Sequence, residues 1–257
     1  MVVNIAIDGT SASGKSSIAS GVAKALGYLH LNTGSLYRAY ALKLLNENVL
    51  NPTIDDVIKL INSTDVNVEF VNGAQVTLLD GKAVDNLLND NKVSKIASHI
   101  SPFIELRGKV VLLQRKLASM YNIVIEGRDI GSVIIPNAKY KFFVTASDEV
   151  RATRRLAQLK ENNIVATFED VLQGIKDRDV IDSTREHSPL VKTEDAILID
   201  TSNINLQQGI DLVLSYIDDS DKKRNWIFQT KKETLKLFPF LLFCCVFIKI
   251  CGFCIKF

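Results

Sequence analysis

The sequence predicts an α/β fold, a doubly wound parallel sheet of five strands covered by helices. Helical patterns separate five short apolar runs, and this alternation is typical of parallel sheets whose two faces are both buried. A small antiparallel insert at about 65–85 interrupts it. The five predicted strands are Val3–Asp8, Tyr28–Leu31, Asn122–Glu126, Lys141–Thr145 and Ala196–Asp200.

The first strand leads into a phosphate-binding loop. Residues 9–16 read Gly-Thr-Ser-Ala-Ser-Gly-Lys-Ser and match the pattern G-x-x-x-x-G-K-[ST]. A helical pattern with Ile18 and Val22 follows and ends at Gly27. Backbone N–H groups and the helix N-terminus attract phosphate. We expect Lys15 to reach the β- and γ-phosphates and Ser16 to ligate magnesium. A plain connecting loop is the disfavoured alternative, because the Lys-Ser pair and both flanks fit a triphosphate site.

A second polar segment follows the next strand. Asn32–Arg38 reads Asn-Thr-Gly-Ser-Leu-Tyr-Arg and opens a helix at the carboxyl edge of the sheet, where open α/β sheets bind ligands. Arg38 is placed there to pair with a phosphate, and the alternative is an exposed helix arginine. Further on, Thr53–Asp56 has the residues of a helix start.

The insert has the period-two pattern of strands. Val66, Val68 and Phe70 alternate with polar residues, and Asn-Gly at 72–73 and Asp-Gly at 80–81 predict hairpin turns. Residues 92–120 then resume a long helical pattern that carries Ser98 and Arg107.

The third predicted strand ends in a charged turn. Glu-Gly-Arg-Asp at 126–129 places Arg128 and Asp129 over the same edge of the sheet as the phosphate loop. A simple polar turn is the alternative.

Two arginine groups follow. Arg151, Arg154 and Arg155 are spaced to share one helix face, where like charges repel unless an anion lies among them. Arg178, Asp182 and Arg185 are also spaced to share a face. Solvated helix faces are the alternative for each group. Two arginine groups over one phosphate loop suit a reaction that brings several phosphoryl groups into one cleft.

The composition limits the kinds of partner and the cellular compartment that we expect for this chain. The formal net charge is +2, so the chain as a whole does not attract nucleic acid. All four cysteines lie in the last fourteen residues, starting at Cys244. We therefore expect a cytoplasmic protein without disulfides or thiol chemistry in its body, and one that is monomeric.

The last forty residues differ from the rest. A polar segment at 218–224 precedes an apolar run of twelve residues, Leu237–Ile248, which is shorter than the ~20 needed to span a bilayer. The Cys251–Cys254 pair has CxxC spacing, but no second pair accompanies it. We interpret 218–257 as an atypical extension, with a membrane or partner anchor and a metal or redox role as alternatives.

Taken together, these motifs resemble the bacterial cytidylate kinases over about residues 1–217. The resemblance implies the nucleoside monophosphate kinase fold, with the family's insert and a mobile helical lid at about 151–185. It also implies transfer of the γ-phosphoryl group of ATP to CMP or dCMP with Mg²⁺, in pyrimidine nucleotide metabolism.

The resemblance assigns site residues by position. It implies that Lys15, Arg128, Arg154 and Arg155 are catalytic. For ATP it implies Gly9, Thr10, Ser11, Ala12, Ser13, Gly14, Lys15, Ser16, Ser17 and Arg151, with Ser16 also on the metal. For CMP it implies Thr33, Arg38, Ser98, Arg107, Arg128, Asp129, Arg178, Asp182 and Arg185.

Three departures from the family pattern are visible. Asn32 stands where the family usually has Asp, Val180-Ile181 replaces a more polar pair, and Ser17 replaces the commoner Thr. The first two remove charge near the acceptor site. Two rival functions remain: a kinase for another monophosphate such as UMP, and a nucleotide-dependent switch that docks on a membrane through the tail.

Overall fold

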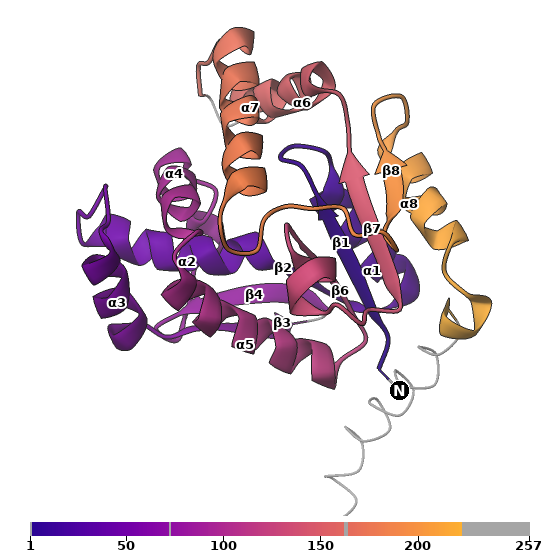
Figure 1. Cartoon of the computed structure of the whole chain (residues 1–257), viewed down its shortest axis with the longest axis horizontal. Helices are drawn as coiled ribbons and strands as arrows, with labels where there is room; N and C mark the ends of the chain where they lie inside the picture. The colour runs from indigo at the N-terminus through magenta and orange to yellow at the C-terminus, as the bar shows by residue number, and fades with distance from the viewer. Residues whose placement is uncertain (1, 72, 162–163, 223–257) are drawn as a thin grey trace, which may run out of the picture. The chain divides into compact units, whose positions relative to one another are not determined.

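The computed structural model describes residues 2–71, 73–161 and 164–222 (Figure 1). Residues 1–216 form one compact unit, and a second unit starts at Ile217. The predicted apolar run and all four cysteines lie outside the described residues, as does Asn72 of the first predicted hairpin turn. No helix in the described part is long and apolar enough to cross a membrane.

The predicted five-stranded parallel sheet is confirmed. Its strands are β1 (Asn4–Gly9), β2 (Leu29–Asn32), β6 (Ile123–Gly127), β7 (Tyr140–Thr145) and β8 (Ile197–Asp200), in the order β2-β6-β1-β7-β8. The register places Asn32 beside Glu126, and Asp8 beside Gly127. The residues that end β1, β2 and β6 therefore meet at one edge, which is where the predicted polar segments begin. Helices α1 (Lys15–Leu26) and α8 (Leu206–Ser215) pack against each other.

The small antiparallel sheet is also present. It consists of β3 (Val66–Val71), β4 (Ala74–Leu79) and the short β5 (Lys82–Ala83), with a 3₁₀ turn at Asp85–Leu87 after it. Before it come α2 (Thr33–Asn46) and α3 (Ile54–Ser63). The helix start predicted at Thr53 is confirmed, because the Thr53 and Asp56 side chains cap each other's backbone N–H groups.

The long helical pattern at 92–120 is two helices rather than one. These are α4 (Asn91–Ile100) and α5 (Ile104–Met120). Pro102 lies between them, and proline has no backbone N–H with which to continue the helical hydrogen bonds. The break places Ser98 and Arg107 on different helices. A short π-helical segment, Ile130–Ile134, follows β6.

The two arginine-bearing helices form a pair with a small core of its own. Helices α6 (Asp148–Glu161) and α7 (Phe168–Thr184) pack through Ala152, Leu159, Val171 and Ile175. Figure 1 shows them side by side. Helix α6 follows the end of β7, and a long segment connects the end of α7 to β8. Arg178 and Asp182 lie on α7, but Arg185 is the extended residue that ends it. The predicted helix face therefore holds only for the first two.

Candidate active site

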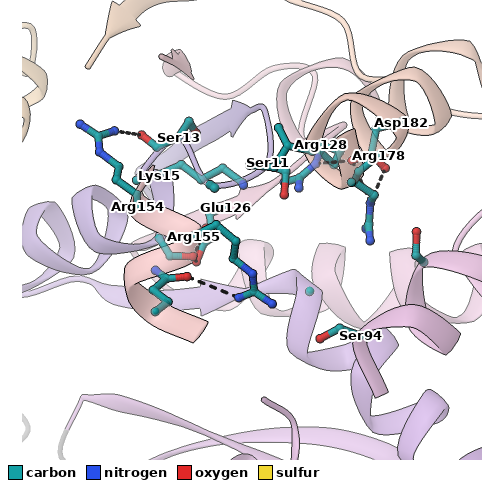
Figure 2. A pocket seen from close by; sticks show the side chains of 18 of the residues that line it. Ser11, Ser13, Lys15, Ser94, Glu126, Arg128, Arg154, Arg155, Arg178 and Asp182 are labelled. Carbon is teal, nitrogen blue, oxygen red and sulfur yellow. Dashed lines mark hydrogen bonds and ion pairs between the residues drawn. The ribbon is translucent and has the colours of Figure 1, made fainter. Parts of the chain in front are cut away.

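A cavity of about 1230 Å³ brings most of the predicted site residues together (Figure 2). The phosphate loop, the start of α2, helices α4 and α5, the turn after β6 and the helix pair all contribute to its walls. The predicted residues that line it are Ser11, Ala12, Ser13, Gly14, Lys15, Ser16, Ser17, Thr33, Arg38, Ser98, Arg107, Arg128, Asp129, Arg154, Arg155, Arg178, Asp182 and Arg185. Gly9, Thr10 and Arg151 do not line it.

The phosphate loop needs its glycines. Gly14, which precedes α1, has φ 87°, and Gly9 has φ 152°. A Cβ at Gly9 would lie 2.0 Å from the Val144 carbonyl oxygen on β7, so only glycine fits there. These two positions let the loop turn tightly between β1 and α1, leaving the N-terminus of α1 open towards the cavity.

Lys15 lines the cavity. Its Nζ donates to the Thr10 carbonyl oxygen at 3.2 Å. Burial, followed by the positive charge of Arg128, lowers the pKa of Lys15 to about 7. Glu126 and Asp182 oppose this shift only in part, and a negatively charged ligand beside Lys15 would raise its pKa again by adding counter-charge.

A carboxylate that the sequence analysis did not select lies against the loop. The Ser16 hydroxyl donates to Glu126, with 2.6 and 2.7 Å to its two carboxyl oxygens. His30 Nε2 lies 3.2 Å from Glu126 Oε1. Burial favours the neutral form of Glu126, but the hydrogen bond from His30 and the charge of Lys15 hold its pKa below the usual range. A hydroxyl beside an ionised carboxylate is an oxygen donor set of the kind that Mg²⁺ prefers.

At the far end of the cavity, arginines are paired with carboxylates. The buried Arg107 donates to Asp129 and to the Ser101 carbonyl oxygen, the latter at 3.0 Å. Arg185 donates through Nε to the Ser188 carbonyl oxygen at 2.6 Å. Arg107 Nε and Arg185 Nη2 are buried and have no hydrogen-bond partner among the described residues. Such donors indicate a polar ligand.

Asp182 joins two more arginines. Arg128 Nε lies 2.7 Å from Asp182 Oδ2, and Arg178 Nε lies 3.3 Å from the same oxygen. Burial alone would raise the pKa of Asp182, but Arg128 and Arg178 hold it below the usual range. In Figure 2 this cluster and Arg154 stand on opposite sides of Lys15.

Arg38 is a cation without a partner. It makes no hydrogen bond or ion pair that the structure records among the residues it describes, and its guanidinium lies beside Gly34. Burial and the neighbouring Arg178 lower its pKa. A guanidinium without a recorded partner, close to the charges of Arg178 and Arg128, is a strong site for an anion.

The three arginines of α6 do not share one environment. Arg154 donates to the carbonyl oxygens of Ser13 at 3.4 Å and Thr201 at 2.7 Å, and Arg155 donates to Asn91 on α4 at 3.2 Å. Both line the cavity.

Arg151 differs from the expectation that it contacts ATP. It is 3% exposed, and its guanidinium binds Asp148, Asp179 at 2.5 Å and the Ser11 carbonyl oxygen at 3.1 Å. Asp179 also accepts the Ser11 N–H at 3.3 Å. Arg151 and Asp179 therefore hold the loop from behind rather than facing the cavity.

Asp8 is a second carboxylate that the sequence analysis did not select. It accepts the backbone N–H groups of Ile130 and Gly131 at 2.8 and 2.7 Å, and burial raises its pKa to about 6 despite them. It thereby fixes the turn that carries Arg128 and Asp129. Its position before the glycine loop was the one signal for it in the sequence.

Comparisons with known proteins identify the family of the chain. The family model described as cytidylate kinase matches residues 5–219. A cytidylate kinase of Caldicellulosiruptor saccharolyticus is 41% identical over 212 residues, which cover 82% of this chain and 94% of that protein. One from Clostridium botulinum strain Loch Maree is 42% identical over 215 residues, covering 84% and 97%.

Proposed function

This chain belongs to the cytidylate kinase family, whose members transfer the γ-phosphoryl group of ATP to CMP or dCMP, and we propose that the cavity described above holds both substrates at once. The observation that carries the proposal is the continuity of the cavity from the phosphate loop to the arginine–carboxylate clusters. A nucleotide switch needs only the first of these, so the second half of the cavity counts against that rival.

The donor half would bind ATP through the loop. The backbone N–H groups of residues 12–17, which line the cavity, would cradle its phosphates, and the Lys15 ammonium would stabilise charge on the transferring group. Arg154 and Arg155, which reach the cavity from α6, would neutralise the charge that builds on the phosphates. Arg151, with its guanidinium fully used, would support the loop instead of binding ATP.

The acceptor half would bind CMP. Arg38, the unpaired cation, and Arg128 would hold its phosphate, with Thr33 beside them. The buried donors of Arg107 and Arg185, the carboxylates Asp129 and Asp182, and Ser98 and Arg178 would bind the sugar and base. Paired arginines keep a fixed orientation, as recognition of a planar base requires.

Magnesium would be held by Ser16 and Glu126. Their hydroxyl and carboxylate oxygens fit the ion, and when bound it neutralises charge on the phosphates. The attacking atom is a phosphate oxygen that is already anionic, so the chain has no proton to remove. Its residues align the two substrates and stabilise the charge of the transition state. The helix pair α6–α7 would act as the lid that excludes water.

The remaining expectations are part of the same proposal. Residues 1–217 would form the kinase domain of a monomeric cytoplasmic enzyme, and residues 218–257 would take no part in catalysis.

A coupled assay of ADP production tests the substrate. Purified chain is assayed with ATP and Mg²⁺ and with CMP, dCMP, UMP or AMP. We expect kcat/KM for CMP and dCMP to exceed that for AMP and UMP by about 100-fold, or ~2.7 kcal/mol. Equal or better turnover of UMP would overturn the choice of acceptor. ADP release without any acceptor, at the same rate, would favour the switch.

A further inference from the structure

A single glutamine connects the small antiparallel sheet to the start of α2. Gln75, on β4, accepts the backbone N–H of Asn32 through Oε1 at 2.7 Å. Its Nε2 donates to the Ser35 hydroxyl at 2.6 Å and lies 3.1 Å from the Thr77 hydroxyl. The Gln75 side chain thus connects Asn32, which precedes α2, to Ser35 in the first turn of that helix.

This contact lies between two cavities. We call residues 32–35, which join the end of β2 to the first turn of α2, the acceptor loop. Asn32, Thr33 and Gly34 line the catalytic cavity, whereas Gln75 lines a second cavity of about 530 Å³. Asn32 and Arg38 line both cavities, so the acceptor loop lies between them. Gln75 contacts the loop from the second cavity and does not line the one proposed to bind CMP.

The network is buried and internally satisfied. Thr77 is fully buried and Ser35 is 7% exposed. The Ser35 hydroxyl donates in turn to the Asn32 carbonyl oxygen at 2.7 Å. A buried polar network with its partners present fixes one geometry, whereas removing one member leaves the others without partners. The side chain of Asn32 makes no capping hydrogen bond at the start of α2, and its backbone N–H donates to Gln75.

The acceptor loop also reaches the donor half. The Thr33 hydroxyl donates to the Glu126 carbonyl oxygen at 2.7 Å, and the Glu126 carboxylate accepts from Ser16. A shift of the loop would therefore move Thr33 and the first turns of α2, which carry Arg38.

We propose that Gln75 is a positioning residue for the phosphoryl acceptor: it holds the acceptor loop so that Thr33 and Arg38 meet the phosphate of CMP. This gives the small sheet a function in acceptor binding. The inference rests on the proposed assignment of the acceptor half.

The test replaces Gln75 by a side chain of similar length that forms no such hydrogen bonds. For Gln75→Met we expect KM for CMP to rise about tenfold and KM for ATP to change less than twofold. By NMR hydrogen exchange, the Asn32 amide should exchange at least tenfold faster. Gln75→Glu keeps an acceptor for that amide but loses the donor to Ser35. It should therefore keep Asn32 protected and give a smaller rise in KM for CMP.

A matched control separates positioning from general weakening of the sheet. Val68 is a buried apolar residue on β3, and Val68→Ala should lower Tm without changing KM for CMP. The inference is overturned if Val68→Ala raises KM for CMP as much as Gln75→Met does. It is overturned as well if Gln75→Met leaves KM for CMP within twofold or raises both KM values equally.

The inference and the proposed function fail in different ways. If Arg128→Ala and Arg185→Ala leave KM for CMP unchanged, the acceptor assignment is wrong, and the inference falls with it. If those variants behave as expected but the Asn32 amide stays protected in Gln75→Met, only the role of Gln75 is wrong.

Discussion

The two halves of the cavity are built in opposite ways. The donor half is largely one contiguous loop between β1 and α1, with its ligand groups in the backbone. The acceptor half draws side chains from α2, α4, α5, the turn after β6 and α7. The pairing of charges also differs along the cavity, although it does not follow the two halves. Arg107, Arg128 and Arg178 have carboxylate partners, whereas Lys15 and Arg38 have none among the described residues.

This difference suggests a division of labour. A paired arginine is already oriented and partly neutralised, so it suits recognition of a nucleoside. An unpaired cation in a buried site gains most from an anion, so Lys15 suits the phosphates of ATP and Arg38 suits the phosphate of CMP. Arg128 would share the phosphate of CMP despite its pairing with Asp182. Variants in each half should therefore separate effects on rate, on ATP and on CMP.

The largest effect is expected at Lys15. Lys15→Ala removes the unpaired charge from the phosphates, and kcat should fall at least 100-fold with Tm within about 3 °C of wild type. The coupled assay and thermal unfolding measure the two. Lys24→Ala, at the exposed end of α1, is the matched control and should keep full activity. A Lys15→Ala variant with more than about a tenth of the wild-type rate would contradict the assignment.

Arginine variants in the acceptor half should separate the substrates. For Arg128→Ala and for Arg185→Ala we expect KM for CMP to rise about 10- to 100-fold and KM for ATP to change less than threefold, because an arginine fork on an anion is hard to replace. Titration of each substrate at saturating partner measures this. Lys176→Ala, exposed on α7, should change neither. A rise for ATP with none for CMP would reverse the two halves.

Asp179 tests the support of the donor loop. In Asp179→Asn the partner of Arg151 loses its charge, and the Ser11 N–H loses a carboxylate acceptor. We expect KM for ATP to rise about tenfold and KM for CMP to stay within twofold. Glu169→Gln, in the exposed first turn of α7, serves as the control. Equal effects on both substrates would mean that the pair stabilises the lid and not the loop.

The pKa of Lys15 makes ATP binding depend on pH. With a pKa of about 7 in the free protein, Lys15 is mostly neutral at pH 8, and bound phosphates raise its pKa. Binding above pH 7 therefore takes up a proton, and affinity for ATP should fall about fivefold from pH 7 to pH 8. Calorimetry at pH 8 in two buffers of different ionisation enthalpy counts the protons. Lys15→Met should abolish the uptake, and the absence of uptake in the wild type would refute the mechanism.

The smallest effect is expected outside both halves. All the residues proposed here to bind or position substrate precede residue 202, so deletion of 223–257 should leave both KM values and kcat unchanged and reduce aggregation of the purified chain. The assay and light scattering measure these outcomes. A membrane anchor would show itself if the full chain sedimented with lipid vesicles and the shortened chain did not. A loss of activity on deletion would place the tail in the catalytic domain.

Much of the fold and the donor half was predictable because the signals are local. The glycine loop places its ligands within eight successive residues, and the strands and the insert follow from short apolar periods. The same holds for the Thr53 helix start. The break between α4 and α5 could also have been predicted, because Pro102 lacks the backbone N–H that a continuous helix needs.

The acceptor residues came together in one cavity as the family resemblance led us to expect, but their pairing depends on tertiary structure. Glu126 meets Ser16 across 110 residues, and Asp179 meets Ser11 across 168. The periodic pattern of apolar residues in the sequence cannot predict such contacts, because the order of the strands and the packing of α6 on α7 determine them. The spacing of Arg151, Arg154 and Arg155 predicted a shared face. Only the packed structure determined that Arg151 turns to the buried side, where Asp179 and the loop carbonyl satisfy its charge and its donors.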